Sequence, residues 1–242
     1  MSGVNSAANR RSAALLVVAV AAGSLGACTF GPRPDAELLE LAQQATADGR
    51  AAHADALYAE IERLCGVDEQ GEVPTSCEVE HTAGQLRPSP APLGAYLEAQ
   101  VPEESVDLVT SQAIELASLD SSGLPATVVT DLEDQELVRE VLRQEHAAVY
   151  GLEASRAFAS NPEWVDTLVE KHEQRVSVLS EAVPEAPVAA AGYTFGGAEL
   201  GDALVEHIEN STADAWAAAA ADATSVEGRT LLVQGAGRAL QR

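Results

Sequence analysis

The chain has 242 residues, with 38 Asp and Glu against 14 Lys and Arg, which gives a formal net charge of −24 at pH 7. This acidity disfavours nucleic acid and anionic lipid surfaces as partners, because both require a basic face on the protein. The sequence contains no Asp-rich loop of EF-hand spacing, so the acidic residues predict a solvated surface rather than calcium storage.

The first 28 residues have the pattern of an export signal. Arg10 and Arg11 precede an apolar run at 13–22, which is too short to span a bilayer stably. The run is followed by Leu-Gly-Ala and Cys28, a sequence that looks like a bacterial lipobox. The resemblance implies a signal peptide at 1–27 and a lipid anchor on Cys28, at the extracytoplasmic face of the cell membrane. An ordinary cleaved signal is the alternative. The paired arginines also leave twin-arginine export open, although the residues after them favour the general secretory route.

Two further cysteines follow the predicted anchor. Cys65 and Cys77 are an even pair in an oxidising compartment, and glycines and a proline between them form a flexible connection. We therefore predict a disulfide, which would contribute about 3 kcal/mol by closing a ring of about a dozen residues. A metal site with the nearby His81 is the alternative, but the spacing is wrong for a zinc knuckle and a fourth ligand is lacking.

The region 28–125 is predicted to be a smaller helical region. Its apolar spacing predicts one long helix at 35–65, with Gly49 as a weak point. The Pro-rich connection at 87–92 cannot be helical, because each proline removes a donor and restricts the residue before it. A second helix is expected at 105–119.

The region 126–242 is predicted to contain four helices joined by short connections. These predicted helices are 136–159, 162–183, 198–223 and 226–238. The closest approach to a strand pattern is the short stretch at 126–129, so the predicted class is all-α.

Two ionisable residues stand in apolar stripes of the predicted helices. Glu145 lies three residues after Leu142 and four before Val149, where a helix of 3.6 residues per turn places an inward side chain. His172 likewise lies within the apolar stripe of the next predicted helix. Burying an unpaired carboxylate costs several kcal/mol, so Glu145 needs a partner. An imidazole on the adjacent helix is a suitable one.

These residues carry a resemblance to a known family. The element at 145–150 (Glu-His-Ala-Ala-Val-Tyr), followed by His172, Arg175, the Gly-Tyr pair at 192–193 and Glu209, resembles the ferritin-like family of unknown function found in actinobacterial lipoproteins. The resemblance implies a ferritin-like four-helix bundle at the end of the chain. The ancestral chemistry of that fold uses a pair of metal ions bridged by carboxylates.

The chain departs from a full two-metal ligand set. Such a set takes a Glu from each of two helices and a Glu-x-x-His from each of the other two. Val169 stands three residues before His172, where that motif has Glu, and the predicted fourth helix has no histidine. Three interpretations of Glu145, His172 and Glu209 therefore remain. Glu145 and His172 form a buried hydrogen-bonded ion pair, or all three residues form a single-metal or degenerate two-metal site for iron or another divalent ion, or the side chains extend to solvent.

Three side chains, Tyr150, Arg175 and Tyr193, are expected to support this group. Tyr150 and Tyr193 are interpreted as hydrogen-bonded core aromatics rather than redox tyrosines. Arg175 is expected to pair with an inward carboxylate, and Trp216 is interpreted as packing.

Two classes of function follow. The first is a non-enzymatic cell-envelope lipoprotein whose bundle binds a partner or small ligand or has a structural role, with no cofactor. The second is a metal-dependent redox or metal-handling protein that uses Glu145, His172 and Glu209. The incomplete ligand set favours the first class, and no Ser-His-Asp grouping, glycine-rich phosphate loop or nucleophilic cysteine suggests a third. The membrane is the expected partner through the lipid anchor. Association of copies through the bundle is left open.

Overall fold

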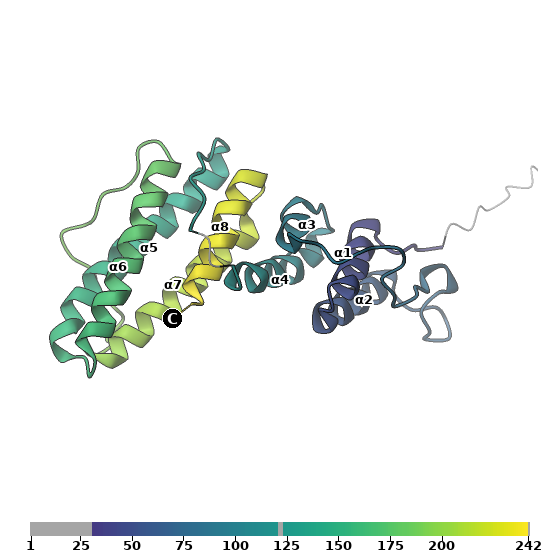
Figure 1. Ribbon diagram of the computed structural model, residues 1–242, viewed down its shortest axis with the longest axis horizontal. Helices are drawn as coiled ribbons and strands as arrows, with labels where there is room; N and C mark the ends of the chain where they lie inside the picture. Colours follow the sequence, from purple (N-terminus) through teal and green to yellow (C-terminus); the bar gives the residue numbers. More distant parts are fainter. Residues whose placement is uncertain (1–30, 121–122, 242) are drawn as a thin grey trace, which may run out of the picture. The chain divides into compact units, whose positions relative to one another are not determined.

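The computed structural model describes residues 31–120 and 123–241, and these ranges contain eight α-helices and no strand (Figure 1). The predicted all-α class is therefore confirmed. The predicted signal peptide and Cys28 lie outside the described residues. The range Pro32–Arg242 is one compact unit. Its helices are α1 (Ala36–Ala47), α2 (Ala51–Cys65), α3 (Pro92–Glu98), α4 (Val106–Ser118), α5 (Leu132–Ser155), α6 (Pro162–Ala182), α7 (Asp202–Asp222) and α8 (Val226–Ala239).

The predicted single helix at 35–65 is wrong, because the chain breaks between α1 and α2. Gly49 adopts a φ of 73°, a left-handed conformation that ends α1 and that glycine adopts without steric cost. The Asp48 carboxylate at this break accepts the Ser89 amide at 2.6 Å, which ties the break to the Pro-rich connection. The short helix α3 was not predicted. It begins at Pro92, where the missing N–H of proline is harmless.

The bounds of α5 and α7 also differ from the prediction. Helix α5 begins four residues before the predicted start at 136, because the Asp131 carboxylate caps it by accepting the amides of Glu133 and Asp134. Helix α7 begins after the predicted start at 198, because Gly201 has a φ of 104° and precedes the first helical residue. The start of α6 agrees with the prediction. Asn161 caps it and Pro162 is its first residue.

The long helices pack in a chain of neighbours. Helix α5 packs against both α6 and α7, α7 packs against α8, and α8 also packs against α4 (Figure 1). One apolar cluster includes residues from α1 through α8, and a second, smaller one is formed by α5, α6 and α7 alone. None of the helices in the described ranges has the length and hydrophobicity that a membrane-spanning helix requires.

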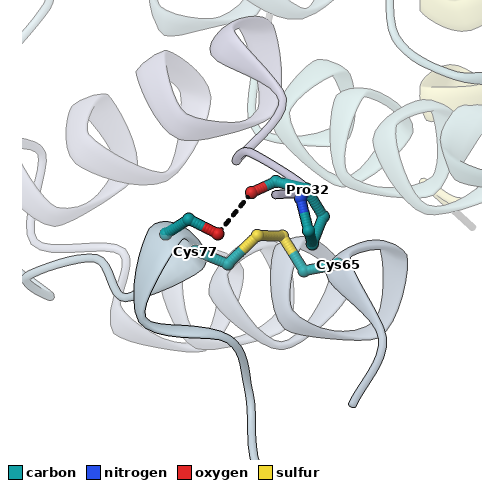
Figure 2. Close-up of a disulfide and its surroundings, with 4 residues drawn as sticks. Pro32, Cys65 and Cys77 are labelled. Carbon is teal, nitrogen blue, oxygen red and sulfur yellow. Dashed lines mark hydrogen bonds between the residues drawn. A yellow bond between two sulfur atoms is a disulfide. The ribbon is translucent and has the colours of Figure 1, made fainter. Parts of the chain in front are cut away.

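The predicted disulfide joins Cys65, the last residue of α2, to Cys77 in a short 3₁₀ turn (Figure 2). Cys77 is fully buried. The adjacent Ser76 hydroxyl donates a hydrogen bond of 2.7 Å to the carbonyl oxygen of Pro32, drawn as the dashed line in Figure 2. The disulfide loop therefore holds the beginning of the compact unit, four residues after Cys28 in the sequence.

Candidate functional site

The three inward polar residues that the sequence singles out lie together in the core. Glu145 of α5, His172 of α6 and Glu209 of α7 have exposed fractions of 0%, 1% and 5%. The Nδ1 of His172 lies 2.5 Å from Oε2 of Glu145, and its Nε2 lies 2.8 Å from Oε1 of Glu209. The imidazole therefore bridges two carboxylates and connects three helices.

These residues form a polar layer between the two apolar clusters, and we use the name polar layer for Glu145, His172 and Glu209. On α5, Leu142 belongs to one cluster and Ala148 to the other, with Glu145 between them. On α6, His172 likewise lies between residues of the two clusters, and on α7 Glu209 does so. The layer thus interrupts the core at the same level on all three helices.

Glu145 has two further partners. The indole Nε1 of Trp216 donates to Oε1 of Glu145 at 2.5 Å, and Nη1 of Arg175 lies 3.5 Å from the same oxygen. The pairing of Arg175 with an inward carboxylate agrees with the sequence prediction. The role of Trp216 does not, because this fully buried indole is a hydrogen-bond donor as well as a packing residue. A sequence pattern cannot show that the indole N–H meets a carboxylate 71 positions away.

The geometry favours the protonated form of His172. A neutral imidazole has one N–H and one bare nitrogen, so one of its two carboxylate contacts would lack a proton. Burial lowers the pKa of His172, but its hydrogen bonds to Glu145 and Glu209 outweigh burial and raise the pKa above the usual value of 6.5. With Arg175, the group then holds two negative and two positive charges, which is the pairing that buried charges require.

The polar layer does not fit a metal site in this arrangement. A metal ion needs the lone pair of an unprotonated ring nitrogen, and both nitrogens of His172 face carboxylate oxygens instead. The two carboxylates also lie on opposite sides of the ring rather than around one point. Within 31–120 and 123–241, no group of three or more His, Cys, Asp or Glu side chains is placed to hold a metal ion.

Tyr150 and Tyr193 are not in the core, so their interpretation as core aromatics is wrong. Tyr150 is 42% exposed, and its ring lies 5.5 Å from that of the partly buried Tyr193. The Tyr193 hydroxyl accepts the Ala190 amide at 2.8 Å. The two tyrosine rings meet outside the core because the segment between α6 and α7 lies over this part of α5. Gly151 leaves room for Phe195 of that segment, because a Cβ there would lie 2.6 Å from the Phe195 ring.

One buried carboxylate, Asp134, is not predicted by the sequence pattern. This fully buried residue accepts the backbone amides of Thr224 at 2.9 Å and Ser225 at 2.8 Å. It therefore holds the connection between α7 and α8 against the first turn of α5. The local sequence offers no signal for this role, because an acid in the first turn of a helix is ordinarily a solvated residue that favours the helix dipole.

No family model, curated protein or solved structure matches the chain. The resemblance to ferritin-like lipoproteins therefore stays a prediction from the sequence, based on the residues at 145–150 with His172, Arg175, the Gly-Tyr pair at 192–193 and Glu209.

Proposed function

We propose that the protein is a lipid-anchored, extracytoplasmic helical module with a non-enzymatic role in binding or in the structure of the cell envelope. The proposal joins two parts of the chain. The lipobox-like sequence ending at Cys28 would provide the anchor, and the helices α5 to α8 would form a bundle of ferritin-like type without the metal chemistry of that fold.

The pairing inside the polar layer is the observation that carries the non-enzymatic proposal. Glu145, His172 and Glu209 are the residues that the alternative metal site would use, and they satisfy one another in the core. A buried polar network of this kind fixes which residues of neighbouring helices face each other, because any shift in register leaves charged groups unmatched. The layer is therefore best suited to setting the alignment of α5, α6 and α7.

A metal-handling role is the second candidate, since one imidazole and two carboxylates do lie within contact distance in the core. That role requires His172 to lose a proton and to break a hydrogen bond before it binds an ion. Elemental analysis of the purified protein separates the two candidates, because a resident metal would appear at a fixed ratio to protein.

The membrane anchor is supported by the sequence around Cys28 and by the place where the compact unit begins. The disulfide loop binds Pro32, so the folded unit starts close to the proposed lipid in the sequence. A short connection of this kind would keep the helical unit near the membrane surface. Because the chain is acidic, the lipid rather than protein charge would have to retain it there.

The anchor is tested by replacing Cys28 with Ser and following the protein in cell fractions. We expect Cys28→Ser to leave the membrane fraction and to appear in the medium or as unprocessed precursor. A protein with both Cys65→Ser and Cys77→Ser should stay in the membrane fraction, since these cysteines would not carry lipid. Retention of processed Cys28→Ser in the membrane would contradict the proposal.

A further inference from the structure

A pocket of about 590 Å³ opens beside the polar layer. Its walls come from α6, from the C-terminal end of α8 and from residues 123–124 after α4. This volume is within the range of pockets that hold small organic molecules. The lining residues are Gly123, Leu124, Lys171, Gln174, Arg175, Ser177, Val178, Arg238 and Gln241.

The charge of this pocket is opposite to that of the protein. Lys171, Arg175 and Arg238 line it, whereas its described lining includes no Asp or Glu. The chain has 14 basic residues against 38 acidic ones, and Lys171 is its only lysine. Three cations in one pocket are therefore a local concentration that the overall composition does not predict.

The sequence of α6 places two of these cations on the same face. Lys171 and Arg175 are four residues apart, so they are neighbours on the helix surface, and Gln174 and Val178 share that face. Two like charges at this spacing repel each other and disfavour the helix. Glu145 pairs with Arg175, and an anion bound at Lys171 would reduce this repulsion further.

Lys171 and Arg238 keep donors for such an anion. The Nζ of Lys171 donates to the backbone carbonyl of Gln241 at 2.9 Å, and Nη1 of Arg238 donates to the Gln241 side-chain oxygen at 3.1 Å. Both acceptors are neutral, and within the described residues neither cation forms an ion pair with a carboxylate. An ammonium group has three donors and a guanidinium group has five, so both retain unused capacity.

Arg175 is the inner wall of the pocket. It is 6% exposed, its Nη2 donates to the Arg238 carbonyl at 3.2 Å, and its Nη1 faces Glu145 of the polar layer. These contacts hold the guanidinium in one position. Because the Arg175 charge is already paired with Glu145, Lys171 and Arg238 are the two cations of the pocket that are left for a ligand.

We propose that this pocket binds a small organic anion, with a carboxylate or phosphate group on a short apolar body. The anionic group would contact Lys171 and Arg238, and Leu124 and Val178 provide apolar surface for the body. The inference deepens the proposed binding role and rests on it. It does not depend on the lipid anchor, so a failure of the Cys28 experiment and a failure of ligand binding are separate results.

Lys171 offers a direct reporter, because reductive ¹³C-methylation of the purified full-length protein labels one lysine and the N-terminal amine while keeping the charge. Hexanoate and hexyl phosphate are the probes, and hexanol is the neutral control. We expect one of the anions to shift the Lys171 signal saturably, and the tighter of the two identifies the anionic group. The N-terminal signal should not change.

Calorimetry on variants then tests the assigned residues. Lys171→Gln and Arg238→Gln should each weaken binding of the better anion by about tenfold or more, because each removes a charge-assisted hydrogen bond. Arg156→Gln is the matched control, since it removes one positive charge that pairs with Asp166 at the surface away from this lining. It should change the affinity less than twofold. Circular dichroism and melting curves identify any variant that fails to fold. If one pocket variant does not fold, the affinity of the other pocket variant tests the proposal.

The proposal is overturned if neither anion binds, or if hexanol binds as tightly as they do. It is also overturned if both folded pocket variants bind the anion like the Arg156→Gln control.

Discussion

The α1–α2 region and the α5–α6–α7 region are held by linkages of different chemistry. In the first, a covalent bond joins Cys65 to Cys77 across 12 positions in the sequence. In the second, hydrogen-bonded charges connect helices across 27 positions between Glu145 and His172, and across 37 between His172 and Glu209. The disulfide is a covalent bond and does not depend on neighbouring side chains. The polar layer is stabilising only when all of its buried partners are present.

This difference predicts how the two regions respond to mutation. A disulfide acts largely by restricting the unfolded chain, so its loss leaves the folded contacts of α1 and α2 in place. In the polar layer, removing one member leaves the others buried without a partner, which costs more than the interaction itself contributed.

The largest effect is expected at Glu145. Glu145→Ala leaves the His172 imidazolium, the Arg175 guanidinium and the Trp216 indole without their shared acceptor. We expect the free energy of unfolding to fall by about 3–5 kcal/mol in denaturant titration. The control is Glu153→Ala on the same helix, which is exposed and should be near neutral. Equal stability of the two variants would contradict the structural role of the layer.

Loss of the disulfide is expected to have the second-largest effect on stability. Replacing Cys65 and Cys77 together by Ala should lower the free energy of unfolding by about 3 kcal/mol, through the entropy of the opened loop. Thiol counting on the denatured, unreduced protein provides the chemical control, because the wild-type pair should give no free thiol. Two reactive thiols from Cys65 and Cys77 would show that the bridge does not form.

A packing variant next to the polar layer has a smaller expected effect. A Cβ added at Gly235 of α8 would overlap the ring of Trp216, which cannot move freely because it donates to Glu145. Gly235→Ala should therefore cost about 1–3 kcal/mol, the usual range for overpacking. Gly94→Ala in α3 is the matched control, since open space surrounds that position. A loss at Gly94 equal to that at Gly235 would show that the Trp216 contact is not the cause.

The dependence of stability on pH should be the smallest effect. Burial and the nearby charge of Arg175 lower the pKa of His172, but its two carboxylate partners outweigh them and raise the pKa in the folded state. Its contribution is therefore fully present below about pH 6.5, the unfolded value, and is lost as the pH rises through the folded-state pKa. Melting temperatures from pH 6 to 9 should decline for wild type and for the exposed control His207→Gln. The decline should be absent in His172→Gln, and an unchanged slope in that variant would contradict the assignment.

The sequence predicted the polar layer well because helical periodicity determines which side chains face inward. Glu145 and His172 each stand in a run of apolar residues, so their burial could be inferred without coordinates. The partners of these residues could not be inferred in the same way. The Trp216–Glu145 contact depends on how α7 rotates and slides against α5, which local spacing does not determine.

The structure differs from the sequence prediction at other positions because contacts between distant segments override the local sequence pattern there. Gly49 was recognised as weak in a long helix, but the break there also depends on the contact between Asp48 and Ser89, 41 positions away. Asp134 is buried because the α7–α8 connection lies against it, and nothing near it in the sequence indicates this. Tyr150 is exposed because its ring meets the segment after α6 rather than the core.

¹⁵N NMR of the His172 imidazole tests whether this residue is a protonated bridge between Glu145 and Glu209. Assignment by comparison with His172→Gln identifies the two ring nitrogens. At neutral pH we predict that both carry protons, and that neither chelator nor added ferrous or zinc ions change their chemical shifts. One unprotonated nitrogen whose signal moves on addition of metal, and returns with chelator, would rule out the protonated bridge and establish a metal site instead.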